Sequence, residues 1–188
     1  MKRLFMLLSF LSLMALISAC SSQPSLKLVD TKVDIVKDKS LSGSVVISEG
    51  GKNGQELVPT VLYYQFKIKN NGFRRIGGAG DKKLKVKIVP GKKLAAASEE
   101  SVGINIFTPS SYNGTGLGYG VQVNGEIQPG KTGNMSLTYD LGVTEENPKV
   151  SLQVPSKEKL EKLKANALDG SLIVTSDGKE IAEFDLKR

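Results

Sequence analysis

The sequence predicts an all-β protein, a mostly antiparallel β-sandwich with one short helix near residues 156–168. Three observations predict this fold. Apolar and polar residues alternate with period two in a series of short segments, as they do in strands with one buried face. Connectors rich in Gly, Pro and Asn separate these segments and supply the backbone angles that turns need. Short strands at this spacing are typical of two packed sheets.

Eight segments before the helix show the strand pattern: 26–36, 41–47, 60–69, 83–89, 102–107, 119–127, 135–141 and 150–154. The clearest is 60–69, in which every second residue is large and apolar: Leu62, Tyr64, Phe66 and Ile68. Their neighbours are mostly polar. We therefore expect one face of this strand in the core and the other in water.

The helix follows Pro155. Ser156 is a good N-cap residue, because its hydroxyl can accept a hydrogen bond from the first turn. Leu160, Leu163 and Ala167 then fall on one stripe at helical spacing. The segment thus predicts an amphipathic helix with one buried face.

A hairpin is predicted at the C-terminus. Strands at 172–175 and 180–186 flank the dipeptide Asp177-Gly178, which is typical of a tight hairpin turn. No internal repeat and no second domain boundary interrupts the chain. We therefore predict a single β-sandwich domain over 26–188.

The N-terminus has the pattern of a secretion signal. Lys2 and Arg3 precede an apolar run from Leu4 to Ile17. The run is too short to span a bilayer as a helix, which takes about 20 apolar residues. A charged start, a short apolar core and a small-residue end predict a signal peptide over 1–19.

The end of this signal, Ile17-Ser18-Ala19-Cys20, resembles the lipobox of bacterial lipoproteins, and Cys20 is the only cysteine in the chain. The resemblance implies diacylglycerol on Cys20, with palmitate-type chains, and a lipidated tether over 20–25. Two acyl chains are sufficient for stable membrane anchoring. The alternative is an ordinary signal peptide with a chance cysteine.

Lipidation on Cys20 implies a place in the cell envelope, on the extracytoplasmic side of a bacterial membrane. Both the cytoplasmic membrane and, in a cell with two membranes, the outer one remain open. Ser21 and Ser22 lack the aspartate that, in lipoprotein sorting, favours retention at the inner membrane.

The composition argues against most enzymes. The chain has no histidine, and its one cysteine is assigned to lipid, so the usual general base, thiolate nucleophile and zinc ligands are missing. We expect no catalytic residues, no cofactor and no metal site. A carboxylate-dependent envelope hydrolase, using pairs such as Glu99-Glu100 or Glu145-Glu146, stays an alternative.

Basic residues cluster in one part of the sequence. Between residues 57 and 98 there are ten basic side chains against one acid, Asp81, in a chain of net charge +7. If these side chains share the solvent face of neighbouring strands, they form a positive panel for an anionic envelope polymer or an acidic protein. The alternative is a solvated face that protects edge strands from aggregation. Candidate binding residues are Lys67, Lys69, Arg74, Arg75, Lys83, Lys85, Lys87, Lys92 and Lys93.

A glycine-rich loop over 114–120 is a second candidate site. Together with this loop, Tyr112 and Tyr119 could face a ligand at one end of the sandwich, where recognition loops are common. The alternative is a mobile connector. Nucleic acid is not expected as a partner outside the cell, and aromatic residues for stacking bases are few.

Two motifs at 63–72 and 125–131 carry a further resemblance. A strand that ends in Lys69-Asn70-Asn71-Gly72, and a later Gln128-Pro129-Gly130-Lys131 turn before a strand, resemble the immunoglobulin-like domains of bacterial lipoproteins. The resemblance covers residues 60–142 and implies a fold and a location more than an activity. We therefore expect a non-enzymatic binding or adaptor module, with a hydrolase or a structural spacer as the alternatives.

Overall fold

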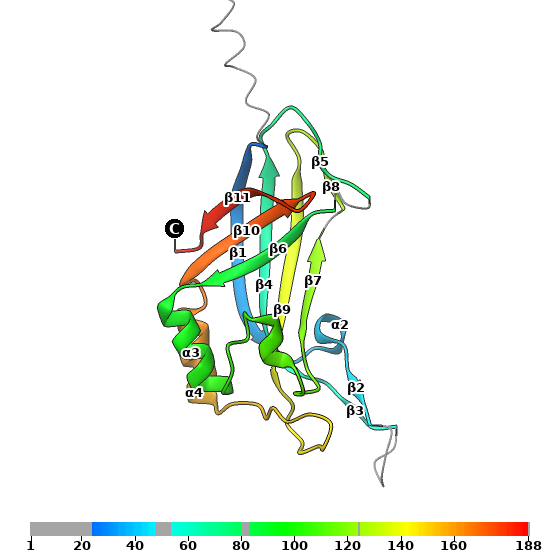
Figure 1. The fold of residues 1–188 in the computed structure, drawn as a ribbon, viewed down its shortest axis with the longest axis vertical. Coiled ribbons are helices and arrows are strands. Elements are labelled where there is room, and N and C mark those ends of the chain that lie inside the picture. The colour runs from blue at the N-terminus through cyan, green and yellow to red at the C-terminus, as the bar shows by residue number, and fades with distance from the viewer. Residues whose placement is uncertain (1–23, 48–53, 80–82, 124, 188) are drawn as a thin grey trace, which may run out of the picture.

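The computed structural model describes residues 24–47, 54–79, 83–123 and 125–187. These residues form a mostly β structure in which two antiparallel sheets make two layers and the helices gather at one end (Figure 1). The prediction of a mostly antiparallel β protein is confirmed. Cys20 and the tether up to Gln23 lie outside the described residues.

The larger layer is a four-stranded antiparallel sheet of order β1-β4-β9-β7. Its strands are β1 (Leu26–Val36), β4 (Thr60–Asn70), β9 (Thr132–Gly142) and β7 (Tyr119–Val123). The alternation predicted for β4 is confirmed, since Leu62, Tyr64, Phe66 and Ile68 are buried and Gln65, Lys67 and Lys69 are exposed. The long central strands β4 and β9 therefore carry the core on one face only.

The smaller layer is a three-stranded sheet of order β11-β10-β6, whose strands run obliquely across those of the larger sheet (Figure 1). It consists of β6 (Lys85–Pro90), β10 (Gly170–Ser176) and β11 (Lys179–Asp185). The predicted terminal hairpin is confirmed as β10–β11, with positive φ at both Asp177 (54°) and Gly178 (69°). These angles are what a tight hairpin turn of this type requires.

Two short ladders complete the β structure of the described residues: β2 (Val45–Val46) with β3 (Glu56–Leu57), and β5 (Ile76–Gly77) with β8 (Glu126–Ile127). The first lies beside a small apolar cluster that includes Ile47 and Val143. The second lies at the opposite end of the larger sheet (Figure 1). The β2–β3 ladder lies below the ends of the central strands, whereas β5–β8 lies beside their upper part (Figure 1).

Helices are more numerous than predicted. The described residues contain α2 (Lys39–Ser42), α3 (Lys92–Val102), the 3-10 turn η2 (Pro109–Tyr112) and α4 (Lys157–Asn166). The predicted helix is confirmed as α4, with Ser156 as its N-cap: the Lys159 N–H points to the Ser156 hydroxyl at 3.5 Å. The prediction of a single helix is wrong. It overlooked α3, whose alanine-rich sequence has high helix propensity.

The strand predicted at 102–107 is also wrong, and Ser98 on α3 explains why. The Ser98 hydroxyl donates to the Ile104 carbonyl (2.8 Å) and accepts from the Ile106 N–H (3.0 Å). The backbone of this segment therefore bonds to the preceding helix instead of a partner strand. The apolar side chains that suggested a strand pack against the core from a loop.

Two more strand predictions are corrected. Residues 150–154 make only isolated bridges, Val143 with Gln153 and Asn147 with Val150. Within 41–47, α2 occupies the first residues because the Asp38 carboxylate accepts from the Ser40 N–H at 2.8 Å and caps a helical turn. The strand is limited to the two residues of β2.

One hydrophobic core lies between the two layers. Buried side chains from β4, β9, β6 and β10 belong to one cluster with residues of α3 and α4. Tyr64 lies at its centre, and its hydroxyl donates to the Ala167 carbonyl at 2.9 Å. The end of α4 is thereby fastened to the larger sheet.

Candidate binding groove between two sheet edges

The basic residues predicted as one panel lie on different layers. Lys67 and Lys69 project from the outer face of β4, because their neighbours Phe66 and Ile68 point into the core. Lys85 and Lys87 project from β6, which belongs to the other sheet. The hypothesis of a single panel on neighbouring strands is therefore wrong, since the two sets point away from opposite sides of one core.

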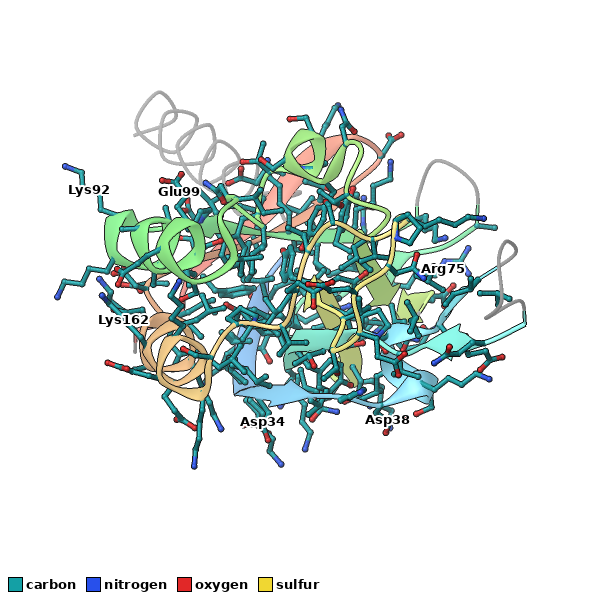
Figure 2. The ribbon with its side chains drawn as sticks, turned by 90° about the horizontal axis from the view of Figure 1, so that it is seen from below. Asp34, Asp38, Arg75, Lys92, Glu99 and Lys162 are labelled. Carbon is teal, nitrogen blue, oxygen red and sulfur yellow. The ribbon has the colours of Figure 1, made fainter. Side chains whose placement is uncertain are left out.

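The remaining members of the predicted cluster are further dispersed. Arg75 lies beside β5 and pairs with Glu126 at 3.6 Å. Lys92 and Lys93 begin α3. In the view along the long axis, Lys92 and Arg75 lie on opposite sides of the molecule (Figure 2). Arg74 precedes Arg75 in the same exposed turn, so the cluster in the sequence is not a cluster in space.

Some of these charges are also neutralised locally. Lys67 on β4 pairs with Asp30 on the adjacent strand at 3.7 Å. Both belong to the outer face of the larger sheet, where they line a polar depression together with Gln65, Gln122 and Asn134. On this face the Asp30 carboxylate thus offsets the charge of Lys67.

The lysines at β6 differ from the others. Lys83, Lys85 and Lys87 are exposed and alternate with Leu84, Val86 and Ile88, which are buried. Among the ion pairs of the described residues, none involves these three lysines. The alternation that puts one side of β6 in the core thus leaves three unneutralised ammonium groups along an edge strand.

The acids on the same outer face are two strands away. Across β10, Lys87 is in register with Ile173 and then with Glu183 on β11. In the next row, Lys85 is in register with Thr175 and Glu180. With strands about 4.7 to 4.9 Å apart, these acids are roughly 9 to 10 Å from the lysine strand, so positive charge predominates at the β6 edge.

An apolar groove runs beside this strand. It lies where the β6 edge of one sheet meets the β7 edge of the other, and it has a volume of about 760 Å³. Tyr119 and Val121 on β7 are 48% and 43% exposed there. Leu137 and Tyr139 on β9 and Phe107 from the loop after α3 complete its apolar lining.

Aromatic rings make the lower part of the groove rigid. Tyr119 stacks on Tyr139 with ring centroids 6.3 Å apart, and Phe107 packs on Tyr139 at 4.7 Å. Tyr139 is buried, which raises its pKa far above the ordinary value of a phenol. Tyr119, Tyr139 and Phe107 therefore form a packed aromatic part of the groove lining.

Tyr112 does not lie where the sequence suggested. It is buried behind Tyr119, with ring centroids 6.5 Å apart, and its hydroxyl donates to the Asp140 carbonyl at 2.9 Å. The expectation that Tyr112 faces a ligand is wrong, because its ring belongs to the core. Tyr119 alone is available at the surface.

The glycine-rich loop is packed and not a mobile connector. Thr115 is buried, its hydroxyl donates to the Tyr112 carbonyl at 2.8 Å, and its carbonyl accepts from the Ser151 N–H at 3.1 Å. Gly116 has φ of 73°, and a Cβ there would lie 1.8 Å from the Lys149 carbonyl oxygen. Gly116 is needed because no other residue fits this close approach.

The carboxylate of Asp140, next to the groove residue Tyr139, has a raised pKa. Burial raises the pKa of Asp140 to about 6, although the Gly118 N–H, which donates to its Oδ2 at 3.0 Å, favours the charged form. No cation pairs with it among the ion pairs of the described ranges. Asp140 thus carries an incompletely compensated charge at neutral pH.

The glutamates considered as catalytic pairs, 99–100 and 145–146, include residues that contact other segments of the chain. Glu100 on α3 pairs with Lys162 on α4 at 2.6 Å, and the hydrogen bond to this lysine lowers the pKa of the Glu100 carboxyl. Figure 2 shows the two helices side by side. Glu145 accepts from the Gln55 amide at 2.8 Å. These contacts join separate segments of the chain.

Two general features of the described residues bear on metals and membranes. Within 24–47, 54–79, 83–123 and 125–187, no group of three or more His, Cys, Asp or Glu side chains is arranged to hold a metal ion. In the same ranges no helix is long and apolar enough to cross a bilayer. No known family model matches the chain, and neither does a curated protein or a solved structure.

Sequence reasoning identified the lysines of β6 but missed the groove beside them. The groove combines β6 with β7 and with the loop at 106–107, which are separate in the sequence. One signal was present: Tyr119, Val121 and Val123 alternate with Gly120 and Gln122. That pattern predicts a strand with an apolar face but not that half of this face stays exposed.

Proposed function

We propose that this chain is a lipid-anchored lipoprotein on the extracytoplasmic side of a bacterial membrane, where it acts as a non-enzymatic binding or adaptor module. The anchor rests on the sequence around Cys20, whose resemblance to a lipobox and unique cysteine are the supporting observations. The described domain would begin a short distance from the membrane, because β1 starts at Leu26. Its ligands would thus belong to the envelope.

The immunoglobulin-like fold is part of the same proposal. Two antiparallel sheets around one core support it, and the turn at 128–131 before β9 has the place that the resemblance implies. The helices α3 and α4 would then be additions at one end of such a domain. They do not cover the β6–β7 side (Figure 1).

One observation carries the binding role. The β6 edge bears three exposed lysines for which the described residues provide no acidic partner. An edge strand with this charge attracts anionic groups, and near a membrane surface each such charge contributes about 1 kcal/mol. We infer that the partner is an anionic envelope polymer or an acidic protein segment.

A comparison of two charge-neutralised variants tests this role. The full chain with Lys85→Gln and Lys87→Gln is measured for retention on an immobilised glycerol-phosphate polymer at low and physiological salt. Lys67→Gln with Lys69→Gln is a matched control, since these are also alternate exposed lysines on a strand, but on the other sheet. The β6 variant should lose retention and the β4 variant should keep it. An equal loss of retention in both variants would mean that retention depends on the net charge of the protein and not on a site at β6.

The anchor has its own test. Cells that express the full chain are grown with radiolabelled palmitate, and a Cys20→Ala variant is compared with the native sequence. We expect label in the native protein alone, and release of the variant from washed membranes. A membrane-retained, unlabelled native protein would disprove lipid anchoring without affecting the β6 result.

A further inference from the structure

We propose that the groove between β6 and β7 binds a single-chain amphipathic anion, a long-chain carboxylate, with its chain on the apolar lining and its head at the β6 lysines. The inference rests on the proposed anion-binding role of β6 and adds a small amphipathic ligand to the polymer or acidic protein segment proposed above. Lining and rim belong to one groove, since Lys85 and Lys87 border the same space as Val121 and Tyr139.

The lining is unusual for a surface that faces only water. Tyr119 and Val121 leave about half of each side chain exposed, and they adjoin Phe107 and Leu137 in a continuous apolar strip. A concave, mostly apolar lining with a few charged groups at its border is typical of small-molecule sites. Covering this strip removes apolar surface from water, and the favourable free energy is largest when a hydrocarbon chain covers its whole length.

The groove is open because both strands are sheet edges. β7 ends the four-stranded sheet and β6 ends the three-stranded sheet, so neither has a second neighbour among the described strands. Figure 1 shows β6 crossing the larger sheet toward the side on which β7 lies. Among the described helices, only η2 borders the groove, through Pro109, whereas α3 and α4 lie away from it (Figure 1).

Charge complementarity selects the head group. Three ammonium groups border the apolar strip, and the nearest acids of the same sheet face are on β11, beyond β10. A carboxylate placed at Lys85 and Lys87 gains charge-assisted hydrogen bonds. A neutral head group would not neutralise the lysine ammonium groups. An anion should therefore bind better than an alcohol of the same chain length.

The size of the groove favours one chain. A volume of about 760 Å³ lies within the range of roughly 300 to 1,000 Å³ that holds one drug-sized ligand. A phospholipid with two chains would exceed the apolar lining. A peptide strand is disfavoured for another reason, because alternating lysines on an edge strand oppose strand pairing.

Photocrosslinking tests the proposal in the full chain, held in neutral phosphatidylcholine vesicles. The probe is palmitate with a diazirine on its chain, and labelled peptides are mapped by mass spectrometry. We expect label at Phe107 and at 119–123. Val121→Asp should reduce this label about tenfold, since an apolar contact is replaced by a like charge. Val29→Asp is the matched control, because Val29 is 53% exposed on the opposite edge of the same sheet.

Competition defines the ligand class. Unlabelled palmitate should displace the probe, and hexadecanol should do so about tenfold less well because it lacks the charge. Equal competition by hexadecanol, stronger competition by phosphatidylglycerol or by an acidic peptide, or equal label in both valine variants would overturn the proposal. Melting curves of both variants verify folding, and Val121→Thr, which keeps the shape of the side chain, replaces Val121→Asp if the latter unfolds.

The two proposals fail separately. If polymer retention depends on Lys85 and Lys87 but palmitate label does not map to 119–123, the β6 anion site stands and the acyl ligand is rejected. If polymer retention does not depend on Lys85 and Lys87, the proposed function is rejected as well. Val121→Asp should leave polymer retention within the range of the Val29→Asp control.

Discussion

The two open sides of the molecule resemble each other in construction and differ in chemistry. On one side the edge strands β6 and β7 meet; on the other the edge strands β1 and β11 meet. Each side has a groove of similar size, about 760 Å³ and 630 Å³. The β6–β7 side combines lysines with exposed apolar residues, whereas the β1–β11 side carries the acids Asp30, Glu183 and Asp185.

Three acids on or near the β1–β11 side have partners within the molecule. Asp30 pairs with Lys67, and Asp34 pairs with Lys164 of α4 at 2.7 Å. Nearby, Asp169 pairs with Lys187 and accepts from the N–H groups of Lys93 and Leu94 at the start of α3. These three acids thus join strands and helices.

The β6–β7 side has no such use for its charges. Its lysines have no acidic partner among the described residues, and the half-buried Asp140, next to the groove residue Tyr139, has no ion pair among them. Compensated charges hold a fold together, whereas uncompensated charges beside apolar surface attract something from outside. The comparison therefore indicates a structural role for the paired acids near one side and supports the proposed binding role of the other.

The largest expected effect comes from the floor of the β6–β7 groove. Leu137 is 1% exposed and belongs to the core as well as the groove. Leu137→Ala should lower the free energy of unfolding by about 2 to 5 kcal/mol, as buried leucine truncations do. Leu28→Ala, at a half-buried position on the other side, should cost less. Urea unfolding of both variants measures the difference. Equal losses of unfolding free energy would mean that the two grooves do not differ in how much their lining residues stabilise the fold.

Two carboxylates should respond to pH in opposite directions. The raised pKa of Asp140 means that its contribution is favourable below its unfolded value near 3.8 and is lost as pH rises through about 6. Between pH 4 and 8 the loss is up to about 3 kcal/mol. Asp140→Asn should remove it and thus stabilise the protein relative to wild type at pH 8.

Asp169 provides the contrast. The ion pair with Lys187, together with backbone N–H donors, holds the pKa of Asp169 below its usual value. Its contribution is present at neutral pH and is lost as pH falls through that lowered pKa. Asp169→Asn should lower the melting temperature at pH 7, and this deficit should shrink as the pH falls below about 4. Melting temperatures measured from pH 3 to 8 test both variants, and parallel curves would contradict the comparison.

A smaller loss is expected from the hydrogen bond that fastens α4. The buried Tyr64 hydroxyl donates to the Ala167 carbonyl at 2.9 Å. Tyr64→Phe leaves that carbonyl without its donor and should cost about 1 to 3 kcal/mol. Tyr63→Phe, at the neighbouring half-buried position on the outer face, is the control and should cost less. Denaturant unfolding measures both losses. An equal loss of unfolding free energy in the two variants would mean that the Tyr64 hydrogen bond does not stabilise the docking of α4.

The smallest effect concerns the lysines of β6. Lys85→Gln with Lys87→Gln should change the free energy of unfolding by no more than about 0.5 kcal/mol per site, as exposed substitutions without partners do. A larger loss, measured by urea unfolding, would mean that these lysines stabilise the fold. The loss of polymer retention in this variant could then no longer be attributed to binding.

Local features were predictable from the sequence. The period-two pattern identified β1, β4, β6 and β9, Asp177-Gly178 identified the hairpin, and Ser156 identified the start of α4. Each depends on residues close together in the chain. The pattern failed at 102–107, where the Ser98 side chain takes the hydrogen bonds that a strand would need.

What the sequence by itself determined is which residues of a segment share a face, because that follows from the geometry of a single strand or helix. Only the tertiary structure decided which segments share a sheet. It separated Lys67 and Lys69 from Lys85 and Lys87, and it joined β6, β7 and the loop at 106–107 into one groove. Pairing between distant strands depends on closing the whole core, and alternation along one strand contains no information about its neighbour.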